Sequence, residues 1–137
     1  MGGNTEIPLN LRVVAATNQN IAELVKMGRF REDLYFRLNV FHIEIPPLRD
    51  RREDLPVIIE YHLKRLSGAM GKNVTRIAPK AFQVFNTHDW PGNIRELVNV
   101  LENAMIMCKG DSISVSDLPT HLLSGGSTMV LNQNNMV

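Results

Sequence analysis

The chain contains 137 residues, which corresponds to one domain or two small ones and excludes a large multidomain enzyme. Hydrophobic residues make up 44% of it, and 15 Lys and Arg nearly balance 14 Asp and Glu, so the composition is that of a globular protein. A net charge of +1 makes attraction of nucleic acid by bulk charge a poor default, and no apolar run reaches the roughly 18 residues that cross a membrane.

Residues 1–47 predict a strand, two short helices and a second strand. The apolar run at 11–16 ends in polar residues, as a buried strand does where it reaches a loop. Residues 20–28 show a capping box, helical spacing and a closing glycine, and residues 31–38 predict a further short helix. Residues 41–45 alternate and stop at a proline pair, so this order indicates two parallel strands of an α/β sheet.

Residues 48–123 predict four helices and no strand. The first is a long helix with an apolar stripe from Leu55 to Met70, closed by Gly71, and the second begins near Pro79 and buries two phenylalanines. The third is predicted to start with Asn93 as its cap and to stop at Gly110, and the fourth covers 116–123.

The predicted fold class is therefore mostly α. It has an incomplete α/β part with two strands at 1–47, a four-helix part at 48–123, and a flexible tail or linker at 124–137, where Gly, Ser, Asn and Gln dominate.

Thr17 and Asn18 follow the first predicted strand, at the sheet edge where α/β proteins bind ligands. Their hydroxyl and amide are suited to orienting a water or sensing a phosphate. On position alone, a role for Asn18 in shaping the turn is an equally good interpretation.

Two arginines belong to the 31–38 helix. Arg31 is predicted at its start, where the positive end of the helix dipole makes a cation unfavourable by about 0.3–1 kcal/mol, so a partner is needed. Arg37 has an ordinary explanation in an ion pair with Asp33, four residues earlier. The spacing of the two arginines points them in different directions, which predicts different contacts.

Arg95 is predicted in the first turn of the 93–110 helix, again at the positive end. Helix N-termini attract anions, and an arginine there makes a better phosphate clamp. The alternative is a pair with Asp89 or solvation alone.

Several chemistries have no motif in these residues. The only Gly-Lys pair, Gly71-Lys72, lacks the other residues of a phosphate loop, and no strand ends in paired acids that bind magnesium. The four histidines are far apart, so no metal site is expected. The single cysteine, Cys108, lies on an apolar stripe as a core residue, and we expect a cytoplasmic location and no membrane contact.

Four strings in this order closely resemble one family. They are RVVAATN (12–18), GRFREDLYFRLNV (28–40), PPLRDRREDL (46–55) and WPGNIREL (90–97). They are similar to the C-terminal part of the AAA+ ATPase domain of the sigma-54-dependent transcriptional activators, the NtrC-like bacterial enhancer-binding proteins. The resemblance covers about residues 11–123.

The resemblance implies a role for each candidate residue. Thr17 and Asn18 match sensor I, which senses the γ-phosphate; Arg31 and Arg37 match the arginine fingers that act in trans on a neighbouring subunit's nucleotide; Arg95 matches the sensor II arginine of the helical lid. It also implies ATP with magnesium as cofactor of the full-length protein, a hexamer, and sigma-54 RNA polymerase as partner.

The family's phosphate loop and sigma-54 loop are expected upstream of these residues, and its DNA-binding helix-turn-helix downstream. We therefore expect this chain alone to be inactive as an ATPase and to bind no nucleotide tightly. We also expect the lid to fold by itself while residues 1–47 pair abnormally, dock on another copy or remain loose. The alternative hypothesis is a non-catalytic helical module that binds a protein partner or DNA, and a third is another AAA+ branch.

Overall fold

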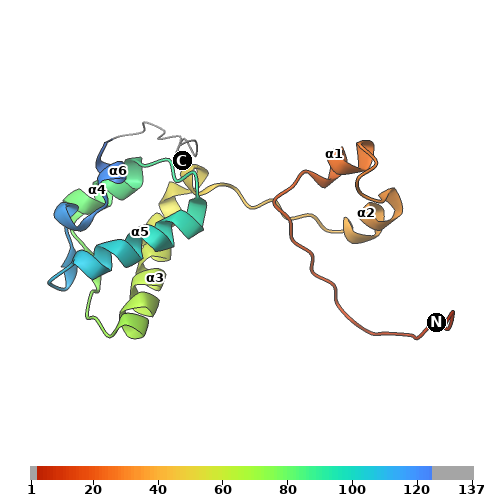
Figure 1. Ribbon diagram of the computed structural model, residues 1–137, viewed down its shortest axis with the longest axis horizontal. Coiled ribbons are helices and arrows are strands. Elements are labelled where there is room, and N and C mark those ends of the chain that lie inside the picture. Colours follow the sequence, from red (N-terminus) through yellow and green to blue (C-terminus); the bar gives the residue numbers. More distant parts are fainter. Residues whose placement is uncertain (1–2, 125–137) are drawn as a thin grey trace, which may run out of the picture. The chain divides into compact units, whose positions relative to one another are not determined.

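The computed structural model describes residues 3–124, which divide into two compact units between Glu44 and Ile45. Each unit is described by itself (Figure 1).

The first unit contains two short helices, α1 (Ile21–Lys26) and α2 (Glu32–Leu38). The predicted cap of α1 is confirmed, since the Asn20 side chain accepts a hydrogen bond from the Glu23 N–H at 3.3 Å. After α1 the chain reverses through Gly28, whose φ of 70° suits glycine. No residue of 3–44 is buried, so this unit has no core of its own.

The two strands predicted at 11–16 and 41–45 are wrong. Neither segment makes a backbone hydrogen bond within residues 3–124, and their apolar side chains are exposed, with Val14 and Phe41 at 83%. An apolar run becomes a strand only when neighbouring strands take up its backbone N–H and C=O groups, and the described residues supply none.

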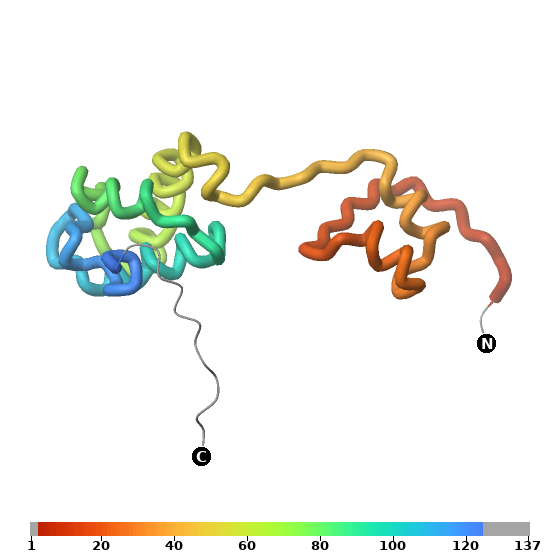
Figure 2. Tube along the Cα trace, turned by 90° about the horizontal axis from the view of Figure 1, so that it is seen from above, coloured from red at the N-terminus to blue at the C-terminus, as the bar shows by residue number. Residues whose placement is uncertain are grey.

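The second unit is helical, as predicted, with four α-helices. These are α3 (Leu55–Met70), α4 (Pro79–Thr87), α5 (Asn93–Met107) and α6 (Thr120–Leu123), accompanied by the 3-10 turns η1 (Leu48–Asp50), η2 (Arg52–Asp54) and η3 (Val115–Asp117). The tube view shows this part of the chain, coloured yellow to blue, folding back on itself (Figure 2). No described helix has the length and hydropathy of a membrane span.

All of the buried core in residues 3–124 lies in the second unit. The predicted stripe of α3 is confirmed, with Leu55, Ile59 and Leu63 at most 4% exposed. The stripe packs in one cluster with Phe85 of α4 and with Trp90, which is fully buried and donates its indole N–H to the Phe85 carbonyl at 2.8 Å.

The prediction that the helical part contains no strand is wrong. Strands β1 (Arg76–Ile77) and β2 (Ser112–Ile113) form a two-stranded parallel sheet. Each strand has only two residues, too few to produce the alternating pattern by which a strand is recognised in sequence.

The predicted ends of two helices also need correction. Helix α5 ends at Met107 rather than Gly110, because Cys108 turns to extended backbone and is buried. The segment 116–123 is not one helix, since Pro119 separates η3 from α6. The predicted tail, apart from Ser124, lies outside the described residues.

Candidate functional site

The loop between α4 and α5 sets the direction of the helix that carries Arg95. Its cap is Gly92 rather than Asn93, and both Trp90 and Asn93 have φ of 51°, a left-handed conformation that costs about 1–3 kcal/mol in a residue other than glycine. The loop is held because Trp90 is buried and because the Asn93 Oδ1 accepts a hydrogen bond from the Leu48 N–H at 2.8 Å.

Glu96 closes the first turn of α5. Its Oε2 accepts from the N–H of the cap residue Gly92 at 2.8 Å, and its Oε1 lies 2.7 Å from the His88 Nε2. The two side chains are only 18% and 13% exposed, so this contact lies between the loop and the helix.

Arg95 lies in that same first turn and is exposed. Of its two alternative explanations, the pair with Asp89 is wrong, because Asp89 pairs instead with Arg52 at 3.1 Å, whereas solvation alone agrees with the exposed side chain. Within residues 3–124, the Arg95 guanidinium makes no hydrogen bond or ion pair, although it lies at the positive end of a 15-residue helix. An anion is therefore the ligand that this position favours.

Arg31 has a partner that the sequence did not predict. It caps α2 by position and holds Asp33 through two hydrogen bonds, of 2.7 Å and 3.1 Å, with side chains 80% and 63% exposed. The predicted pair of Asp33 with Arg37 is therefore wrong. Arg37 lies in the last turn of α2, where the helix dipole favours a cation, and its side chain is exposed.

Asn18 lies in an exposed bend before α1, and Thr17 directly precedes that bend. The Thr17 Oγ1 accepts a hydrogen bond from the Gln19 N–H at 3.1 Å, which shapes the turn. Among the candidates of the first unit, Thr17, Asn18, Arg31 and Arg37, no hydrogen bond or ion pair joins any two within the described residues.

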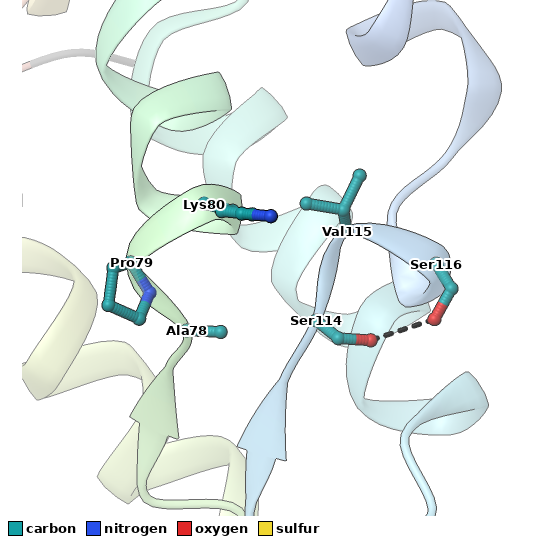
Figure 3. A pocket seen from close by; sticks show the side chains of 6 residues that line it. All are labelled: Ala78, Pro79, Lys80, Ser114, Val115 and Ser116. Carbon is teal, nitrogen blue, oxygen red and sulfur yellow. Dashed lines mark hydrogen bonds between the residues drawn. The ribbon is translucent and has the colours of Figure 1, made fainter.

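One open hollow of about 570 Å³ lies on the second unit. Figure 3 shows its walls: the start of α4 with Pro79 and Lys80, and the segment after β2, where Ser114 and Ser116 bond each other at 2.8 Å. It contains none of the predicted site residues. No group of three metal-ligating side chains occurs in residues 3–124 either.

Two cations missed by the sequence analysis close helix ends. Arg52 donates to the carbonyls of Asn86, in the last turn of α4, and of His88, its C-cap. The Lys72 Nζ donates to the Met105 and Ile106 carbonyls of α5 at 2.6 and 3.1 Å. Their partners are 33–36 residues away, so no local pattern marks them.

Two family models match the chain. The one described as the sigma-54 interaction domain matches residues 1–44, and the one described as the AAA+ ATPase lid domain matches residues 49–134.

Curated relatives and solved structures agree with these matches. Nitrogen fixation protein VnfA of Azotobacter vinelandii is 48% identical over 89% of this chain and 23% of its own length, and regulatory protein AtoC of Escherichia coli is 43% identical over 89% and 26%. The chain thus spans about a quarter of these relatives. The crystal structure of NtrX from Brucella abortus in complex with ATP matches 96% of this chain and 31% of that one, with a TM-score of 0.76 and 33% identity. The chain therefore belongs to the sigma-54-dependent transcriptional activators, and it corresponds to the C-terminal part of their AAA+ ATPase domain.

Proposed function

We propose that this chain supplies the nucleotide-sensing part of an ATPase that remodels sigma-54 RNA polymerase. Thr17 and Asn18 act as sensor I, Arg31 and Arg37 as arginine fingers in trans, and Arg95 as sensor II. In this division residues 1–47 belong to the α/β subdomain and residues 48–123 form the lid.

The observation that carries the proposal is the state of Arg95. The Arg95 guanidinium is exposed, has no partner in residues 3–124 and lies at the positive end of a long helix. It is therefore free to bind an anion. The oxygens of a triphosphate are suitable anionic ligands, since arginine binds phosphate through paired hydrogen bonds. The matching NtrX structures contain ATP in one case and ADP in another.

The cofactor and partners follow from the same proposal. The full-length protein binds ATP with magnesium, assembles as a hexamer in the cytoplasm, contacts sigma-54 RNA polymerase and binds DNA through a C-terminal helix-turn-helix. A single catalytic unit then requires two subunits, because the nucleotide is bound by one and the fingers come from the next.

The Arg31–Asp33 pair does not oppose this role. Both side chains are well exposed, and such surface pairs contribute about 0–1 kcal/mol, so a phosphoryl group can displace the carboxylate.

The test mixes two inactive versions of the full-length protein. One carries Arg31→Ala, and the other carries a substitution of its own phosphate-loop lysine. Fingers that act in trans restore ATP hydrolysis in mixed rings, because an intact nucleotide site from the first then meets an intact finger from the second. Fingers that act within one subunit give no recovery, which would contradict the proposal. Arg29→Ala, at a nearby exposed arginine, is the matched control and retains activity.

The 137-residue chain by itself contains no Gly-x-x-x-x-Gly-Lys string and is proposed to hydrolyse no ATP. Phosphate release from the purified chain, abolished by Arg31→Ala, would contradict this.

A further inference from the structure

The loop that precedes α5 is fastened to the segment that precedes α3. The Arg52 Nη1 donates to the backbone carbonyls of Asn86 and His88, the latter at 2.8 Å, and its Nη2 pairs with Asp89 at 3.1 Å. These carbonyls lie at the end of α4, where no further turn of helix takes them up. One side chain therefore fixes both the end of α4 and the beginning of the loop.

A second contact fixes the other end of the loop. The Asn93 Oδ1 accepts from the Leu48 N–H, across 45 residues of sequence, and Asn93 is the first residue of α5. Its φ of 51° is tolerated by asparagine better than by most residues. Asparagine thus meets two requirements here, a left-handed backbone and a short side chain with an acceptor. Figure 1 shows the segment before α3 beside the first turn of α5.

These contacts do little for the core itself. Helix α5 is already held by Leu97 and Leu101, both fully buried, whereas Arg52 and Asp89 remain 31% and 75% exposed. Exposed polar contacts add little to the free energy of unfolding. The forked guanidinium of Arg52 and the Oδ1 of Asn93 nevertheless fix the direction in which the α4–α5 loop enters α5. What they direct is the turn that carries Arg95.

We infer that Arg52 and Asn93 are positioning residues for nucleotide binding: by fastening the α4–α5 loop to residues 48–52, they aim the Arg95 guanidinium at the phosphates. This inference rests on the proposed role of Arg95. Neither residue touches the nucleotide, and both act through the start of α5.

The test is a double-mutant cycle in the full-length protein, with the dissociation constant of a non-hydrolysable ATP analogue and the ATPase KM and kcat as readouts. Arg95→Ala is expected to weaken binding roughly tenfold, as for loss of a charge-assisted hydrogen bond. Arg52→Met and Asn93→Gly are each expected to weaken it about threefold, and to have no further effect when Arg95→Ala is present.

Matched variants separate positioning from folding. Asn93→Gly keeps the left-handed backbone but loses the acceptor, so a lower affinity in this variant reports the lost contact with Leu48 rather than a strained backbone. Arg76→Met removes another exposed Arg–Asp pair, the 2.6 Å contact with Asp111, and should leave binding unchanged.

The outcomes distinguish the two levels of the argument. If Arg52→Met weakens binding equally with and without Arg95, the positioning role is wrong while sensor II stands. If Arg95→Ala itself leaves affinity unchanged, the proposed function of Arg95 fails and the inference fails with it. If Arg52→Met unfolds the full-length protein, amide exchange at Glu96 and Leu97 in folded Asn93→Gly decides. Exchange as slow as in the unchanged protein, together with unchanged affinity, overturns the inference.

Discussion

Gly92 occupies the most crowded glycine position in the described chain. A Cβ at this residue would lie 2.6 Å from the Cβ of Glu96, which cannot move without its helix. We predict that Gly92→Ala lowers the free energy of unfolding by about 1–3 kcal/mol, the usual cost of overpacking. Urea unfolding followed by the fluorescence of Trp90, the only tryptophan, measures this.

Gly68→Ala is the control for that substitution. Gly68 lies within α3 with nothing inside 4 Å of an added Cβ, so alanine should stabilise the chain by about 0.5–1 kcal/mol. Equal effects of the two substitutions would mean that the crowding at Gly92 is absent in solution.

We predict that the free energy of unfolding depends on pH through His62, whose pKa differs between the folded and unfolded chain. Burial, followed by the charge of Arg65, lowers the pKa of His62 from 6.5. Since the unfolded chain then binds the proton more readily, this contribution is complete above about pH 6.5 and is lost as the pH falls through the lower folded pKa. Unfolding free energies measured from about pH 8 to about pH 5 should decline less in His62→Gln than in the unchanged chain. Parallel curves would contradict the prediction.

At the residue scale, the burial of Cys108 could be predicted from the sequence, whereas the ion pairs of the charged residues could not. Cys108 was correctly expected in the core because its position follows from helical spacing. The partners of Asp33 and Asp89 were wrongly predicted, since an exposed carboxylate chooses among several cations by small differences in rotamer and reach.

At the scale of elements, helix α5 depends on a cation from outside itself. The Lys72 Nζ donates to the carbonyls of Met105 and Ile106, which lack intrahelical partners. We predict that Lys72→Met lowers the free energy of unfolding by about 1–2 kcal/mol, through lost hydrogen bonds and a lost charge at the negative helix end. The same urea titration measures this.

Lys80→Met serves as the comparison, because Lys80 is exposed at the start of α4, where a cation is mildly unfavourable. It should leave stability within about 0.5 kcal/mol of the unchanged chain. If Lys80→Met lowered the free energy of unfolding as much as Lys72→Met, the effect would not come from the contacts of Lys72 with α5.

Helices and strands differed in how far they could be predicted. The stripe of α3 and its end at Gly71, which has a φ of 63°, follow from contacts within about four residues. The strands predicted at 11–16 and 41–45 depended on partner strands that the described residues do not contain. The pair β1 and β2 formed instead, although two residues carry no pattern.

At the scale of the whole molecule, the core is confined to one unit. Every buried hydrophobic residue of the described range lies between Leu48 and Leu122. We predict that removal of residues 1–44 leaves the urea midpoint of Trp90 fluorescence unchanged. In the full chain, amides of residues 11–16 and 41–45 should exchange at the rate of an unstructured peptide. Slow exchange across both segments in a demonstrated monomer would contradict this, as would a lower midpoint after truncation.

The burial of Cys108 makes the chain convenient for site-specific labelling. Its thiol is 6% exposed and directed to the carbonyls of Gly110 and Ser112 at 3.4 Å, so maleimide reagents reach it slowly in the folded protein. A cysteine introduced at exposed Asn99, one helical turn beyond Arg95, would accept a fluorophore without removal of the native thiol. If Arg95 has the proposed sensor II role, the emission of such a probe in the full-length protein is expected to change when nucleotide is added.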